Sequence, residues 1–140
     1  MKTLLRLLQF NFIPRSPDVA LLVLRVWLGL SMLVLHGWGK MTRFFGGATG
    51  FPDPLGVGWR VSMGLTVFAE VVCAALIVLG LATRFAALVS VILLVVVFAV
   101  LNGMKLSGSG ELAFVYLAGF VALFLAGPGR FSVDGRTGGA

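Results

Sequence analysis

Five ionisable side chains stand inside or at the rims of long apolar stretches of this chain: Arg25, His36, Lys40, Glu70 and Glu111. A charged group in an apolar environment is costly, so each of these residues needs a partner or a function. Carboxylate, imidazole and ammonium groups can bind a polar head group and transfer protons near neutral pH. We therefore take these residues as the candidates for binding and proton-transfer chemistry.

Arg25 and Glu70 are predicted to face each other. Arg25 lies about seven residues from the cytoplasmic end of its apolar segment and Glu70 about eleven from that of its own, a depth difference of about 6 Å. An arginine side chain can bridge this distance, which predicts a buried charge-assisted pair. Such a pair either only fixes the helix register or belongs to a functional site, and both interpretations stay open.

A second group of residues is expected at the opposite, outer end of the helices. His36, Trp38 and Lys40 end the first apolar segment, and Glu111 begins the last one. Below a glycine-rich connection they could hold the head group of a ligand, or they could form an interfacial belt of snorkelling side chains. Tyr116 either hydrogen-bonds toward Glu111 or Glu70, or anchors its helix at the membrane surface.

Several chemistries are excluded by composition. The single cysteine, Cys73, lies in an apolar segment and is expected to be a packing residue, so the chain has no cysteine pair or cysteine metal site. A lone histidine excludes a multi-histidine metal site within one chain, although a symmetric dimer could pair two copies of His36, and no metal is expected. The net charge of +6 comes from scattered basic residues, which argues against nucleic acid as a partner.

The elements that must position these residues are transmembrane helices. Of the 140 residues, 59% are hydrophobic and 11% are charged, and the mean hydropathy is +1.08. Long apolar segments in a bilayer must be helical, because the backbone has no other way to satisfy its hydrogen bonds there. We predict an all-α, single-domain integral membrane bundle of four helices, with a short amphipathic helix on the membrane surface at the N-terminus. The predicted spans are 19–38, 61–81, 85–103 and 111–126, with an irregular outer loop at 39–60, the most plausible lid, and a tail at 127–140.

The orientation follows from the basic residues, which favour the cytoplasmic side. Four spans place six of them with the two termini and four on the other side: Lys2, Arg6, Arg15, Arg84, Arg130 and Arg136 against Lys40, Arg43, Arg60 and Lys105. Both termini are therefore expected in the cytoplasm.

Four fragments of the sequence resemble, in order and spacing, the DoxX family of small bacterial membrane proteins with four helices. They are LRVWLGLSMLVLHGWGKM, FAEVVCAALIVLGLATRFAAL, GELAFVYLAG and GPGRFSVD, and the resemblance runs from residue 21 to 134. It implies a multi-pass protein of the bacterial inner membrane. The family's recurrent positions fall here on Arg25, His36, Gly37, Lys40, Glu70, Arg84, Glu111 and residues 127–134.

The resemblance implies a membrane redox function, since members are associated with thiosulfate:quinone oxidoreductase and terminal quinol oxidase. We expect a quinone-interacting subunit with His36, Glu70 and Glu111 as proton-transferring residues. The expected quinone-binding set is Arg25, His36, Trp38, Lys40, Glu70, Glu111 and Tyr116. The lack of a cysteine pair argues against thiol chemistry on this chain, so a partner or the quinone carries the electrons.

Two other functions stay open. One is a carrier or binding protein for a small molecule, held by Arg25 and gated by the loop. The other is a scaffold subunit, which needs no pocket and would have a packed centre between the first, second and fourth spans. Besides the lipid bilayer, the expected partners are a second copy of the chain or a larger redox complex.

Overall fold

Four long helices form the molecule, and each is long and apolar enough to cross a membrane. The computed structural model describes residues 4, 8, 10 and 14–138 and places no strand among them, which confirms the all-helical prediction. The first span, Pro17–Phe45, joins α2 (Pro17–Ser31), the π-helical η1 (Met32–Gly37) and α3 (Trp38–Phe45); the second, Trp59–Leu79, joins α4 (Trp59–Val67), η2 (Phe68–Cys73) and α5 (Ala74–Leu79). The third, Thr83–Leu101, joins α6 (Thr83–Val96) and η3 (Val97–Leu101), and the fourth is α7 (Ser109–Ala126).

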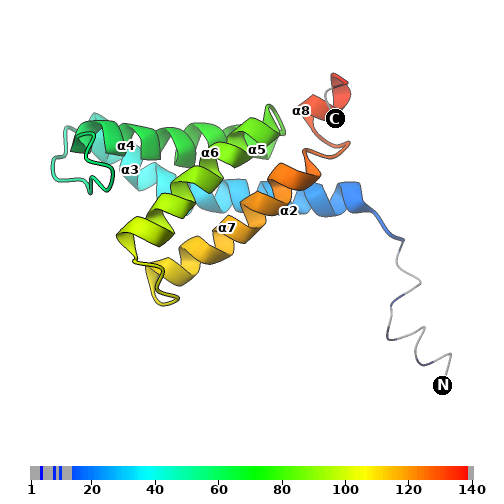
Figure 1. Cartoon of the computed structure of the whole chain (residues 1–140). Coiled ribbons are helices and arrows are strands. Elements are labelled where there is room, and N and C mark those ends of the chain that lie inside the picture. Colours follow the sequence, from blue (N-terminus) through cyan, green and yellow to red (C-terminus); the bar gives the residue numbers. More distant parts are fainter. Residues whose placement is uncertain (1–3, 5–7, 9, 11–13, 139–140) are drawn as a thin grey trace.

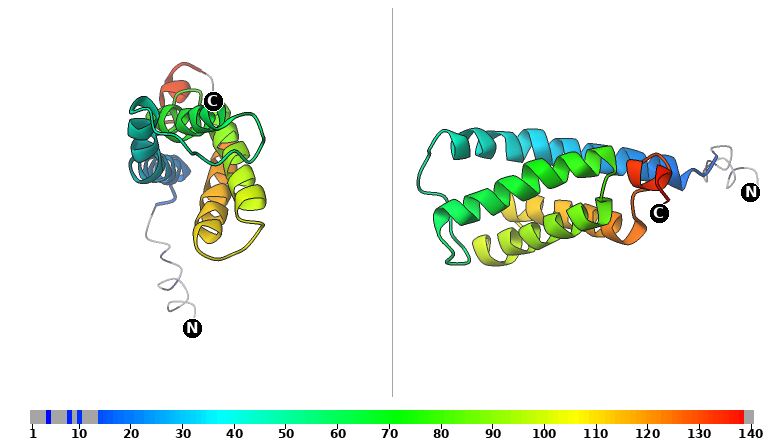
Figure 2. Two further views of the ribbon diagram at one scale, coloured as in Figure 1. Left: turned by 90° about the vertical axis from the view of Figure 1, so that its left-hand side faces the viewer. Right: turned by 90° about the horizontal axis from the view of Figure 1, so that it is seen from above.

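The spans run up and down beside one another, and each packs against its neighbours in the chain (Figure 1). The fourth span also packs against the first, which closes the bundle. The start of α2 projects beyond the end of α5 (Figure 2). A short helix, α8 (Val133–Arg136), lies at this end of the molecule. The predicted N-terminal amphipathic helix falls outside the described residues.

The first helix is longer than the sequence suggested. It continues to Phe45, although an irregular loop was expected from residue 39. It ends at Gly46, and Gly47 follows with a φ of 73°, a conformation that glycine adopts without strain. The irregular connection is therefore confined to the residues between Phe45 and Trp59.

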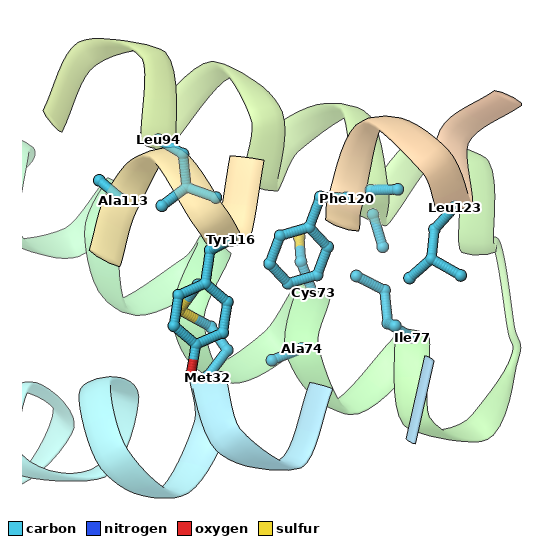
Figure 3. Close-up of a cluster of buried hydrophobic side chains, with 11 residues drawn as sticks. Met32, Cys73, Ala74, Ile77, Leu94, Ala113, Tyr116, Phe120 and Leu123 are labelled. Atoms are coloured by element: carbon cyan, nitrogen blue, oxygen red, sulfur yellow. The ribbon is translucent and has the colours of Figure 1, made fainter. Parts of the chain in front are cut away.

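A buried hydrophobic core lies among the four spans (Figure 3), and the third span contributes Leu94 to it. Met32 comes from the first span, Cys73 and Ile77 from the second, and Phe120 and Leu123 from the fourth. The last four are fully buried, so Cys73 is a packing residue as expected. These side chains fill this part of the bundle.

The predicted pair of Arg25 and Glu70 is wrong. Arg25 is 2% exposed, and its Nη1 donates to the carbonyls of Ile77 at 3.4 Å and Val78 at 3.1 Å. Its Nη2 donates to the carbonyl of Phe131. The carbonyls in the last turn of a helix lack partners within the helix, and a guanidinium satisfies both their hydrogen bonds and the negative end of the helix dipole.

The prediction failed because it placed the cytoplasmic ends of the first and second spans at a common level. The first span projects past the second, so Arg25 lies beside Val78, near the end of α5. Glu70 lies eight residues before Val78, which corresponds to about 12 Å along the helix axis. The arginine side chain therefore meets carbonyl oxygens at a level where we expected a carboxylate.

The C-terminal segment completes this end of the bundle. Asp134 Oδ1 accepts from the Ala82 N–H and Oδ2 from the Thr83 N–H, each at 2.9 Å, which caps the start of α6. Burial raises the pKa of the Asp134 carboxyl, but these hydrogen bonds and the charge of Arg25 lower it further, so it lies below its ordinary value. Gly80 has a φ of 71°, and a Cβ there would lie 2.1 Å from Arg25 Nη1.

We expect Arg25→Leu to lower the free energy of unfolding by about 3 kcal/mol, because it leaves buried carbonyls without their charged donor. Thermal unfolding in mild detergent measures the loss. Arg84→Leu is the control, since Arg84 is exposed and donates a long hydrogen bond of 3.4 Å to the Leu125 carbonyl. Equal small losses in both variants would contradict the structural role of Arg25.

Candidate functional site

Lys40 and Glu70 form an ion pair at the opposite end of the bundle from Arg25, in which Glu70 is buried and Lys40 is partly exposed. Lys40 Nζ donates to Glu70 Oε1 at 2.5 Å and to Oε2 at 2.6 Å. Side chains on a helix lean toward its N-terminus. Because the two spans are antiparallel, Lys40 and Glu70 lean toward each other from successive levels. Glu70, which is 5% exposed, is therefore paired with Lys40 and not with Arg25.

Gly37 allows the two helices to approach closely at this level. An ideal Cβ on Gly37 would lie 2.5 Å from the backbone oxygen of Glu70, a distance that side chains do not tolerate. His36 and Gly37 belong to the π-helical η1 and Glu70 to the π-helical η2, and these two segments contact each other. π-Helical turns inside α-helices occur frequently at functional sites.

His36 lies on the side of the ion pair that faces the fourth span. Its ring meets the Tyr116 ring edge to face, with centroids 5.5 Å apart, and Tyr116 stacks on Phe120 at 6.3 Å. The imidazole is also within electrostatic range of Glu70 and Lys40. The structure therefore brings four of the predicted site residues together: His36, Lys40, Glu70 and Tyr116.

Three other predicted site residues lie elsewhere. Arg25 is at the far end of the bundle, bound to carbonyls. Trp38 is 59% exposed and points away from the bundle, as residues in contact with lipid do. Glu111 is exposed in the first turn of α7, where an acidic residue is favourable to the helix dipole, and it makes no ion pair within the described part of the chain.

A cavity of about 540 Å³ lies beside the ion pair, between the second and third spans. This volume is in the range typical of small-molecule sites. Its walls are mostly apolar, and the polar side chains among them are Lys40, Ser62, Thr66, Glu70, Asn102 and Ser109. Sequence reasoning missed this cavity, although the four-residue spacing of Ser62, Thr66 and Glu70 places them on one helix face.

The loop after α3 forms one wall of the cavity, through Phe51, Pro52, Pro54 and Leu55. Asp53 holds the loop in place. Its Oδ1 accepts from the Ser62 hydroxyl at 2.6 Å and the Val57 N–H at 3.1 Å, and its Oδ2 accepts from the Gly58 N–H at 2.8 Å. These bonds, the one from Ser62 above all, hold the pKa of the Asp53 carboxyl below its ordinary value.

The chemical capacity of this site is narrow and specific. It offers an ammonium, a carboxylate and two hydroxyls at one edge of an apolar cavity, with an imidazole behind the carboxylate. Within the described residues, no cluster of three His, Cys, Asp or Glu side chains could hold a metal ion. The arrangement suits an amphipathic molecule whose polar group exchanges hydrogen bonds or protons.

Lys40→Met is expected to destabilise the protein strongly, by about 3 to 5 kcal/mol, because it leaves the Glu70 carboxylate buried without a partner. The double variant Lys40→Met/Glu70→Met should recover much of that loss. Adding Glu70→Met to Arg25→Leu should not recover stability, because the two residues have no contact. Unfolding measurements on both double-mutant cycles test this, and coupling in the Arg25 cycle alone would refute the assignment.

Acidification should weaken the hydrogen bonds by which Asp53 holds the loop between α3 and α4. A carboxyl with a lowered pKa in the folded state contributes stability above its unfolded pKa of about 3.9, and this contribution disappears as the pH falls through the lower folded value. We expect Trp59 emission, measured with Trp27 and Trp38 replaced by Phe, to change in that window. Asp53→Asn should abolish this transition, and an unaltered transition in the variant would assign it to another group.

Comparison with known proteins agrees with the arrangement of helices. The sequence profile of the DoxX family matches residues 20–103, more than half of the chain. The matched region contains the ion pair and His36, whereas Tyr116, Glu111 and the C-terminal segment lie outside it. No curated protein and no solved structure matches the chain. The chain belongs to the DoxX family and is an integral membrane protein.

Proposed function

We propose that this protein is a quinone-binding subunit of a membrane oxidoreductase. The observation that carries the proposal is the apolar cavity of about 540 Å³ with the Lys40–Glu70 ion pair in its wall. An ion pair at the edge of an apolar cavity matches a molecule with a polar ring and an apolar tail. The resemblance to redox-associated members of the family points to the same ligand class.

The residues fit such a ligand at both of its ends. Leu65, Phe68, Val89, Ile92 and Val96 offer apolar contact to an isoprenoid chain entering between the second and third spans. Lys40 has three ammonium hydrogens. Two of them are directed at Glu70, so the third remains for a ring oxygen.

A bound quinone would supply the redox chemistry, because its reduction to a hydroquinone takes up two electrons and two protons. The chain's own residues contribute binding and proton transfer. Glu70 can exchange a proton at its free lone pairs, and His36 lies within electrostatic range behind it. With one cysteine and one histidine in the sequence, electrons have to come from a partner subunit.

We place the protein in the bacterial inner membrane with both termini in the cytoplasm. Four spans put both termini on one side, and basic residues favour the cytoplasmic side. In this orientation the Arg25 end faces the cytoplasm and the Lys40 end faces outward. The partner is a second copy of the chain or a larger redox complex, docked on an exposed helix face.

The second candidate function is a carrier for a small amphipathic molecule. It is favoured by the loop that walls the cavity and is fixed by a single carboxylate, Asp53, because such a loop can act as a lid. Arg25, which we expected to hold the cargo, is bound to carbonyls and cannot serve. The packed core suits a scaffold subunit, but a scaffold needs no pocket, and the cavity beside Glu70 would then have no role.

Quinone content per chain, measured after purification in mild detergent, tests the proposal. We expect near-stoichiometric quinone in the native protein and a loss of at least about tenfold in Lys40→Met/Glu70→Met, which leaves the net charge unchanged while removing the polar edge. Trp38→Phe, on the lipid-facing side, is the control and should keep its quinone. Native protein that is folded, free of quinone and unable to take it up would contradict the proposal and favour the carrier.

His36→Gln should leave quinone binding unchanged, because His36 does not line the cavity. In a membrane preparation that retains the partner subunit, we expect the same variant to slow quinone turnover at least about tenfold, since general acid–base groups contribute 10²–10⁴-fold. An unchanged turnover rate would remove His36 from the proton path.

A further inference from the structure

The hydrogen bonds along the cavity wall leave it rich in acceptors. Thr66 Oγ1 donates its hydrogen to the Ser62 carbonyl at 2.8 Å. Ser62 Oγ donates its hydrogen to Asp53 Oδ1 at 2.6 Å, and the lowered pKa of Asp53 keeps this carboxylate an acceptor. A hydroxyl carries one hydrogen and two lone pairs. Both hydroxyls can therefore only accept hydrogen bonds from a ligand, because their hydrogens are already donated within the protein.

Glu70 adds to this acceptor surface. Its two oxygens accept from Lys40 and retain further lone pairs. Ser62, Thr66 and Glu70 are all buried and follow one another at intervals of four residues. They therefore form a line of acceptors along one helix face, with steps of about 6 Å. A six-membered ring with two opposite oxygens can reach two successive members of this line.

Side-chain donors are scarce in the same wall. Among the described lining residues, the free ones are the third hydrogen of Lys40 and the second amide hydrogen of Asn102, whose other amide hydrogen goes to the Val97 carbonyl at 2.8 Å. Turning the Thr66 hydroxyl toward a ligand as a donor would break its bond to Ser62. A ligand that brings hydrogens satisfies this wall better than one that brings only carbonyl oxygens.

We infer that the cavity selects ring compounds whose oxygens carry hydrogens, such as hydroquinones and phenols, over the corresponding quinones and ethers. The inference rests on the proposed function, because the cavity must hold the ligand. It adds the oxidation state that the site prefers. Thr66 is the specificity-determining residue, since its lone pairs lie one turn from Glu70 and its hydroxyl can be removed without a change of shape.

The test compares two matched pairs of ligands by titration calorimetry under argon. The first pair is a 1,4-benzoquinone with a ten-carbon chain and the hydroquinone made from it. The second pair is 4-decylphenol and its methyl ether, which differ in donor capacity without redox chemistry. We expect the hydroxyl-bearing member of each pair to bind at least about tenfold more tightly, as one or two additional hydrogen bonds to buried acceptors allow.

Thr66→Val should lower this preference to about threefold or less while leaving the affinity for the quinone and the ether nearly unchanged. Ser90→Ala is the matched control, because Ser90 is buried and bonds back to the Ala86 carbonyl in the same way but does not line the cavity. It should keep the full preference.

The outcomes separate this inference from the proposed function. Equal binding within both pairs, or tighter binding of the quinone and the ether, would overturn the inference while leaving quinone binding intact. A preference for the phenol without any binding of the benzoquinone or hydroquinone would support acceptor selection and contradict the quinone function. Absence of binding by all four compounds would overturn both.

Discussion

A charge inside an apolar bundle is stable only where another part of the chain supplies a counter-charge or hydrogen-bond acceptors, and this constraint organises both ends of the molecule. At one end, Arg25 binds the carbonyls that end α5 and the carbonyl of Phe131, so it connects the first span, the second span and the C-terminal segment. At the other end, Lys40 and Glu70 neutralise each other. Arg25 thus holds three segments of the chain together, whereas the Lys40–Glu70 pair lies in the wall of a cavity.

The register between the first two spans decides which charge meets which partner. Gly29 and Gly37 permit close contact, since a Cβ on Gly29 would lie 2.9 Å from the Ala74 oxygen and one on Gly37 would lie 2.5 Å from the Glu70 oxygen. Small residues at such contacts are typical of helices packed in membranes. With the helices held at these two levels, Glu70 comes within reach of Lys40 and Arg25 does not reach Glu70.

Sequence reasoning recovered the four helices because long apolar segments have a single solution in lipid. The cost of intramembrane charges singled out His36, Lys40 and Glu70 as candidates, but it paired Glu70 with Arg25, whereas the structure pairs it with Lys40. It failed for Arg25 because depth was counted from assumed helix ends, and a glycine contact that shifts one helix along another leaves no trace in hydropathy. Trp38 and Glu111 shared the predicted end of the bundle, but neither faces its interior.

The cavity was beyond prediction for a different reason. Its walls are mostly apolar residues that hydropathy treats as ordinary lipid-facing positions, and one wall is a loop whose path depends on Asp53 bonding to Ser62. The line of Ser62, Thr66 and Glu70 was visible as a helical spacing. Whether these side chains donate or accept hydrogen bonds toward a ligand depends on which of their hydrogens are already donated within the protein, and only the structure shows that.

Photoaffinity labelling with an azido-quinone, followed by mapping of the modified residues, tests most directly the claim that the space beside the ion pair is the binding site. We expect labels on the cavity-facing residues of the second and third spans, among them Phe68, Val89 and Ile92, and we expect unlabelled quinone to compete with the labelling. Labels confined to the exposed face of the first span, without competition, would contradict this claim.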